Sequence, residues 1–192
     1  MAQPLGPDVD AQGAEDAAAV VRWARENAAA HGGDPARVFL TWESAGAAHA
    51  ATATLMKRLS PQGRLPIAGA VFISGVYDPE LERIAARQFG MPNPEPRNAA
   101  YFGVDAGKLP GMAVLRNIDA PEVPVLITYA ELDPVQMQAQ AGALFTSLCN
   151  RSGKCPEIAA IPGHGHITQV LGINTGDMSL ATPFLEFVRN TK

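Results

Sequence analysis

The sequence is poor in charge, in cysteine and in long hydrophobic runs, and each shortage excludes a class of protein. Charged residues make up 18% of the 192 residues, and the net charge is −4 with no cluster of Lys and Arg, so no nucleic-acid partner is expected. No apolar run approaches the roughly 20 residues that a membrane-spanning helix needs. The first residues show no basic stretch followed by an apolar run, so no signal peptide is visible. We expect a cytoplasmic protein, or a periplasmic or secreted one if the natural chain starts upstream of Met1.

The two cysteines, Cys149 and Cys155, flank the short segment 150–154. A disulfide across so short a loop would stabilise the fold by only about 2 kcal/mol, and two reduced thiols are an equally good interpretation. No second ligand pair stands at a suitable spacing, so the pattern does not predict a zinc site.

The sequence does contain enough hydrophobic material, 47% of its residues, for one packed domain. Short apolar runs that predict buried strands alternate with stretches of helical periodicity, such as Val20, Val21, Trp23 and Ala24. The predicted strands are 38–41, 67–74, 123–129 and 157–161, and the predicted helices are 15–30, 44–59, 79–89, 135–150 and 180–190. Because the strands are apolar on both sides, this order predicts an α/β fold, a parallel sheet flanked by helices on both faces.

Residues 79–121 interrupt this alternation. The proline-rich segment 91–97 disfavours both a helix and a central strand, and residues 98–121 have weak periodicity and several Gly and Pro. We therefore predict a single domain over residues 1–192, with 79–121 as a cap or insert region over the site.

The most informative segment is Arg37-Val-Phe-Leu-Thr-Trp-Glu-Ser-Ala-Gly46, in which an apolar run ends at a serine and small residues then open a helix. This order places a serine hydroxyl on a tight corner between a strand and a helix, as in the G-x-S-x-G nucleophile elbow. Gly46 fits that pattern, whereas Trp42 occupies the position of the first glycine. The alternative interpretation is that Ser44 simply caps the helix, a position that serine favours.

A serine nucleophile needs a base, and the base needs a carboxylate that orients it. Asp133 follows the third predicted strand, and His164 and His166 lie in a loop after the last one, so all three segments should meet at the carboxyl edge of the sheet. The order Ser–Asp–His is that of the α/β-hydrolases. As alternatives, Asp133 could cap the following helix, Glu131 could serve as the acid, and the two histidines could bind a metal ion.

Together, these segments resemble carboxylesterases of the α/β-hydrolase fold, in particular the hormone-sensitive-lipase-like and kynurenine-formamidase-like groups. The similarity extends over roughly residues 10–190. It is carried by His31-Gly-Gly-Asp-Pro-Ala-Arg-Val-Phe-Leu-Thr-Trp-Glu-Ser-Ala-Gly-Ala-Ala-His49, by Ala130-Glu-Leu-Asp-Pro134 and by Gly163-His-Gly-His-Ile-Thr168.

This resemblance implies a catalytic triad of Ser44, Asp133 and His166. The backbone N–H of Ala45 would donate to the oxyanion. In the formamidase-like group an apolar residue and Ser or Thr follow the base, and His166 has these neighbours whereas His164 does not. Such a reaction needs no cofactor and no metal ion. We expect three further side chains to line the site, namely Trp42, Glu43 and His164.

The expected activity is hydrolysis of a small short-chain carboxylic ester. The alternatives are formamide or amide hydrolysis, as in kynurenine formamidase, and a catalytically silent binding module. Members of these groups carry several strands and a His-Gly-Gly loop, which gives half of the oxyanion hole, before the first helix predicted here. We therefore expect an N-terminally shortened fold whose strand at 38–41 is an exposed edge. Because an exposed edge invites pairing with another chain, we expect a homodimer or a higher homo-oligomer.

Overall fold

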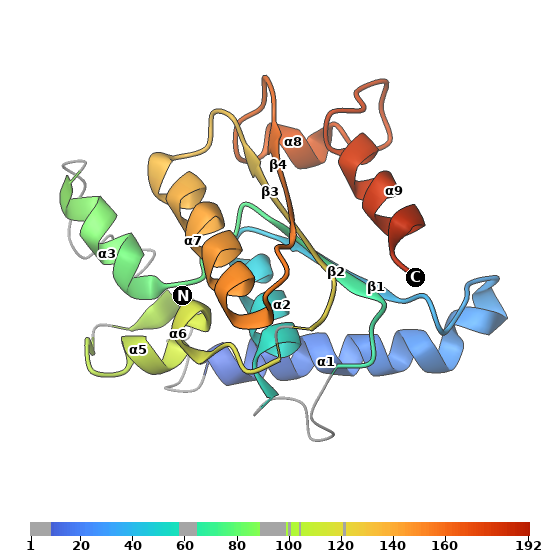
Figure 1. Cartoon of the computed structure of the whole chain (residues 1–192), viewed down its shortest axis with the longest axis horizontal. Coiled ribbons are helices and arrows are strands. Elements are labelled where there is room, and N and C mark those ends of the chain that lie inside the picture. Colours follow the sequence, from blue (N-terminus) through green and yellow to red (C-terminus); the bar gives the residue numbers. More distant parts are fainter. Residues whose placement is uncertain (1–8, 58–64, 89–98, 100, 104, 121) are drawn as a thin grey trace, which may run out of the picture.

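The computed structural model describes residues 9–57, 65–88, 99, 101–103, 105–120 and 122–192 (Figure 1). Four strands form one sheet in the order β1-β2-β3-β4, and each neighbouring pair is parallel. Because the strands run in the same direction, their carboxyl ends share one edge of the sheet. The strands are β1 (Phe39–Glu43), β2 (Gly69–Ile73), β3 (Val125–Ala130) and β4 (Glu157–Ile161).

Helices cover both faces of this sheet (Figure 1). The long helices are α1 (Val9–Asn27), α2 (Ala45–Leu55), α7 (Val135–Ser152) and α9 (Ala181–Asn190). On one face α1, α2 and α7 enclose a core that contains Phe72 and Ile127, and on the other face α9 packs on Val71 and Leu126 through Phe187. The predicted α/β fold is therefore confirmed. In the described part of the chain, no helix has the length and hydrophobicity to span a bilayer.

Small side chains bring α1 close to α2. The buried stripe of α1 contains Ala17, Ala18 and Val21, and a Cβ atom at Gly13 would lie 2.4 Å from the ring of His49. Of the residues whose periodicity predicted this helix, Val21 is buried, whereas Val20 and Trp23 are 55% and 59% exposed. Alanine therefore forms the contact, since it allows the two backbones to approach more closely than a large side chain would.

Several predicted helix boundaries differ from the structure. The first helix starts at Val9, well before residue 15, and its last turn continues as the 3-10 helix η1 (Ala28–His31). Helix α2 ends at Leu55, and the carbonyl of Leu55 accepts the backbone N–H groups of Asp119 and Ala120. The returning chain thus satisfies a carbonyl at the end of the helix, where the last carbonyls have no donor within the helix.

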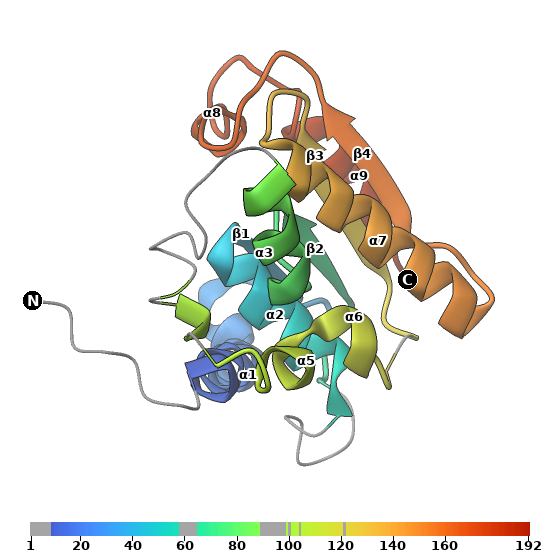
Figure 2. The same cartoon turned by 90° about the vertical axis from the view of Figure 1, so that its left-hand side faces the viewer.

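The segment 79–121 contains α3 (Pro79–Gln88), α5 (Leu109–Met112) and α6 (Val114–Asn117), which lie next to α2 and α7 (Figure 2). The predicted connector 91–97 lies outside the described residues. The function of 79–121 as a cap, and the single domain that includes it, stay predictions.

The two cysteines are joined by a disulfide. Cys149 lies in the last turns of α7, and Cys155 lies just before β4. The bond therefore ties the end of α7 to the start of the outer strand, at the edge of the sheet opposite Ser44.

Candidate active site

Ser44 stands at the corner between β1 and α2. Its φ of 58° is left-handed, a conformation that costs energy for any residue with a side chain and that often occurs at functional sites. The backbone N–H of Ser44 donates to the carbonyl of Ile73 at 2.9 Å, so the pairing of β1 with β2 continues into the corner. The hydroxyl makes no capping hydrogen bond to α2, which leaves it available for other partners.

Trp42 fits into this corner because of Gly46. A Cβ atom at position 46 would lie 2.9 Å from Cγ of Trp42, too close for a real contact. The indole is 38% exposed, and Trp42 keeps its regular parallel register with Phe72. The elbow therefore keeps its shape without the first glycine, since the second glycine provides the space.

Three side chains distant in sequence form a continuous hydrogen-bonded chain at the carboxyl edge of the sheet. Oγ of Ser44 lies 2.8 Å from Nε2 of His166, and Nδ1 of His166 lies 2.8 Å from Oδ1 of Asp133. An ionised carboxylate can only accept, so Nδ1 carries the proton and Nε2 presents its lone pair to the serine. The hydroxyl of Ser44 therefore donates to His166.

The loop after β4 reaches back across the sheet to make this contact. Ser44 follows β1 and His166 follows β4, which are the two edge strands of the described sheet. Oε2 of Glu131 accepts the backbone N–H of Gly163 at 2.8 Å and so holds the start of the loop. The structure thus places Glu131, the alternative acid, against the loop backbone and not against His166.

Both oxygens of the Asp133 carboxylate are engaged. Oδ1 accepts from His166, and Oδ2 accepts from the backbone N–H of Ala130 at 2.7 Å and from the hydroxyl of Ser74. Burial alone would raise the pKa of Asp133, but the hydrogen bonds from His166, Ser74 and Ala130 hold it below its usual value. The N-cap of α7 is Pro134, so Asp133 does not have the capping role that was its alternative.

Ser74 and Gln169 complete this network, and sequence reasoning missed both. Ser74 is fully buried at the end of β2 with a φ of 47°. Nε2 of Gln169 donates to Oγ of Ser74 at 2.7 Å and to the carbonyl of His166 at 3.0 Å. The available signal was that Ser74 ends an apolar run, as Ser44 does, in a strand that parallel pairing could place next to it.

Glu43 also faces His166. Its Oε1 lies 3.5 Å from Nε2 of His166, with the two side chains only 24% and 22% exposed. The hydrogen bond to Asp133 raises the pKa of His166, burial opposes this rise, and the negative charge of Glu43 adds to it, so the pKa lies above its usual value. Burial raises the pKa of Glu43, against the opposing effect of His166.

His164 points elsewhere. Its Nε2 lies 2.7 Å from Oδ2 of Asp177, and its Nδ1 lies 3.3 Å from Oγ1 of Thr168. Of the two loop histidines, the structure brings His166 to Ser44. Within the described ranges, no three side chains of His, Cys, Asp or Glu gather as a metal site would require.

Ala45 is the first residue of α2. The N–H groups of a first helical turn have no acceptor within their own helix, and the helix dipole favours negative charge at that end. The N–H of Ala45, directly after Ser44, is therefore well suited to an anion that forms at the serine.

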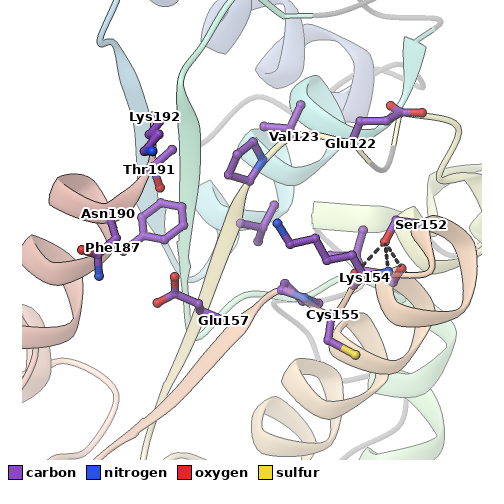
Figure 3. Close-up of a pocket in the computed structure, with 14 residues that line it drawn as sticks. Glu122, Val123, Ser152, Lys154, Cys155, Glu157, Phe187, Asn190, Thr191 and Lys192 are labelled. Carbon is purple, nitrogen blue, oxygen red and sulfur yellow. Dashed lines mark hydrogen bonds between the residues drawn. The ribbon is translucent and has the colours of Figure 1, made fainter.

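A cavity of about 640 Å³ lies at the opposite edge of the sheet, near the amino ends of β3 and β4 (Figure 3). Val123, Cys155, Phe187 and Lys192 are among the residues that line it, and none of the predicted site residues does. The cavity is thus separate from the hydrogen-bonded chain at Ser44.

Comparison with known proteins identifies the family and the fold of the chain. A family model described as the alpha/beta hydrolase fold matches residues 10–169, whereas no curated protein matches the chain. Among solved structures, carboxyl esterase 2 from the mycorrhizal fungus Tuber melanosporum is 23% identical, with a TM-score of 0.65 over 90% of this chain and 60% of that one.

Esterase 2 from Thermogutta terrifontis is similar in two forms. The form phosphoramylated by tabun is 19% identical, with a TM-score of 0.61 over 94% of this chain and 62% of that one. The form with propionate bound is 20% identical, with a TM-score of 0.55 over 92% and 61%. The likeness at these identities is one of fold, and the chain spans about three fifths of the length of these esterases.

Proposed function

The chain belongs to the alpha/beta hydrolase fold family, and on this premise we propose that it is a serine hydrolase that cleaves short-chain carboxylic esters. The observation that carries the proposal is the hydrogen-bonded chain from Ser44 through His166 to Asp133. The esterases of similar fold support an ester as the substrate class, and the propionate bound to the Thermogutta terrifontis enzyme supports a short acyl group.

In the proposed reaction His166 takes the proton of Ser44 through Nε2 while Oγ attacks the ester carbonyl carbon. The backbone N–H of Ala45 donates to the oxygen that becomes negative. The protonated His166 then gives its proton to the leaving alcohol, and an acyl-enzyme on Ser44 remains. Asp133 keeps the imidazole in the reactive tautomer and stabilises its positive charge.

Hydrolysis of the acyl-enzyme repeats these steps with water. His166 accepts a proton from the water molecule, whose oxygen attacks the acyl carbon, and then returns this proton to Oγ of Ser44 as the acid departs. Every step uses side chains and backbone of this chain and a water molecule.

The direct test compares hydrolysis of p-nitrophenyl acetate and butyrate by the wild-type protein and by Ser44→Ala. We expect kcat/KM to fall by at least about 10³-fold, since loss of one triad member removes most of the catalysis. Ser152→Ala is a matched control, because Ser152 lies at the cavity on the opposite edge. Unchanged hydrolysis by Ser44→Ala would show that the proposal is wrong.

Two further assays separate the alternatives. A fluorophosphonate should label Ser44, by analogy with the Thermogutta terrifontis enzyme that tabun phosphoramylates, and a wild-type protein that neither reacts nor hydrolyses esters would be a silent binding module. A higher rate on N-formylkynurenine than on the aryl esters would instead favour a formamidase.

Self-association stays a prediction. β1 is an edge strand of the described sheet, and such an edge can pair with another chain. Light scattering on the purified protein, which gives the mass in solution, checks whether it forms the expected homodimer or higher homo-oligomer.

A further inference from the structure

A second carboxylate lies next to the nucleophile, and one of its oxygens, Oε1 of Glu43, accepts no hydrogen bond within the described part of the chain. This oxygen is buried and lies 3.5 Å from Nε2 of His166. Glu43 is the last residue of β1 and directly precedes Ser44, so the same corner fixes the positions of the carboxylate and of the nucleophile.

The absence of a partner has a simple chemical explanation. In the resting state Nε2 of His166 carries a lone pair that accepts from the hydroxyl of Ser44, and it therefore has no hydrogen to offer Glu43. A buried carboxylate oxygen without a hydrogen bond is destabilising. The position of Oε1 of Glu43 becomes favourable only when Nε2 of His166 gains a proton.

We propose that Glu43 is a positioning residue for His166. Its carboxylate stabilises the imidazolium that His166 becomes when Ser44 gives up its proton. This inference rests on the proposed function and assigns a new role within the same site. As the O–H bond of Ser44 breaks and the N–H bond at Nε2 forms, His166 becomes positive, and the carboxylate of Glu43 lies beside the new charge. When Nε2 passes the proton to the leaving alcohol, His166 is again neutral and Oε1 of Glu43 again has no hydrogen-bond donor.

Glu43 and Asp133 would thus act at different stages. Asp133 binds Nδ1 of His166 both before and after the proton transfer, whereas Glu43 gains an attractive partner only afterwards. An interaction that is stronger in the charged state than in the resting state lowers the barrier. The charged groups that face His166 are Asp133 and Glu43, and those that face Glu43 are His166 and Asp133, so removal of Glu43 leaves Asp133 as the remaining counter-charge.

The test uses Glu43→Gln, which keeps the shape of the side chain and removes its charge. We expect two changes together: the plateau of kcat/KM for p-nitrophenyl acetate falls about tenfold, and its acid limb moves to lower pH. An opposite charge at this distance typically shifts a pKa by about one unit, so the limb should move by about that amount. Glu43→Asp keeps the charge and should leave the limb closer to the wild-type position.

Asp177→Asn is a matched control. It removes a carboxylate that lies against His164 in the neighbouring loop and should leave the acid limb in place. A lower plateau in Glu43→Gln with an unmoved limb would overturn the proposal, because damage to the shape of the corner lowers activity without changing the pKa of His166.

An NMR titration of the His166 imidazole in substrate-free protein separates this inference from the proposed function. The His166→Gln variant identifies the signal, and the pKa should be about one unit lower in Glu43→Gln. If the wild-type protein hydrolyses no ester, the proposed function fails while the titration still tests the pair. If it hydrolyses esters but neither the limb nor the titration moves in Glu43→Gln, Glu43 only lines the site and the inference is wrong.

Discussion

The hydroxyl of Ser74 donates to Oδ2 of Asp133, while the other oxygen of that carboxylate binds His166. Both oxygens of the carboxylate are therefore hydrogen-bonded, and the backbone N–H of Ala130 is a third donor. Because Ser74 directly follows β2 and Asp133 follows β3, the orientation of the imidazole depends on two neighbouring strands. Gln169, which donates to Ser74 and to the carbonyl of His166, closes the network.

Removal of the Ser74 hydroxyl should weaken catalysis, because Ser74 acts through Asp133 and not by contact with the substrate. For Ser74→Ala we expect kcat to fall about tenfold, since a hydrogen bond to a charged group contributes about 1.5–3 kcal/mol. Ser74→Gly loses the same hydroxyl but tolerates the positive φ better. Steady-state kinetics should therefore show similar losses in both variants, and recovery of activity in the glycine variant would implicate the backbone instead of the hydroxyl.

Asp133→Asn should reduce kcat by about 10⁴-fold, the loss seen when the triad acid of a serine protease becomes an amide. The amide can donate to Nδ1, which favours the tautomer with hydrogen on Nε2, and that tautomer cannot accept the proton of Ser44. Glu131→Gln is the control, because Glu131 binds the backbone of Gly163. A loss as large in Glu131→Gln as in Asp133→Asn would contradict the choice of acid.

The acid limb of kcat/KM should follow His166. Only the neutral imidazole can take the proton of Ser44, and the pKa of His166 is raised above its usual value of about 6.5. Activity should therefore fall as the pH decreases through a value above about 6.5. A limb centred near pH 4 would show that another group controls the rate.

Asp133 and His166 should also influence the pH dependence of folding. The lowered pKa of Asp133 contributes stability that is present above its unfolded value, about 3.9, and that is lost as the pH falls through the folded pKa. The raised pKa of His166 contributes stability that is present below about 6.5 and lost as the pH rises through the folded pKa. The melting temperature of the wild-type protein relative to Asp133→Asn should therefore be highest between these values, and a pH-independent difference would contradict the linkage.

Trp42 and Gly46 should behave as a coupled pair. Gly46→Ala alone should destabilise the fold by about 1–3 kcal/mol, because the new Cβ would overlap the indole. The double variant Trp42→Gly, Gly46→Ala should be more stable than the sum of its single changes predicts. Urea unfolding of the wild-type protein, the two single variants and the double variant measures this coupling. Strict additivity would show that the contact between the two positions does not affect the stability of the corner.

The disulfide should matter for stability and not for catalysis. Loss of the Cys149–Cys155 bond through paired alanine substitutions should cost about 2 kcal/mol, since the closed loop is short. It lies at the edge of the sheet opposite Ser44, so kcat should stay within about twofold at 25 °C. Urea unfolding and kinetics on the variant and on the reduced wild-type protein check both expectations.

The features that local sequence patterns encode could be predicted. Apolar runs without alternation gave the four strands and their parallel pairing, and the two small residues after Ser44 indicated a strand-to-helix corner. The resemblance of segment 166–168 to the formamidase-like group favoured His166 over His164, and the structure does bring His166 to Ser44. Each of these conclusions depends on neighbours in sequence or on the order of segments.

The features that depend on neighbours in space could not be predicted. Ser74 binds Asp133 only because β2 lies between β1 and β3 in the sheet, and Gln169 reaches Ser74 from a short helix, α8 (Thr168–Leu171), that no pattern indicated. The helical pattern of α1 did not reveal its buried alanines, because it included Val20 and Trp23, which are exposed, and not Ala17 and Ala18. Only the distance between Trp42 and Gly46 in the structure shows that the indole fits into the corner.

The loop that carries His166 has a consequence for partly unfolded states. Ser44 and His166 follow opposite edge strands, which three strand spacings hold roughly 14 Å apart, yet their side chains meet at 2.8 Å. The contact between Ser44 and His166 therefore depends on every strand pair in between. We therefore expect that opening any one of these pairs separates His166 from Ser44, so that reactivity of the serine should report on the integrity of the whole sheet.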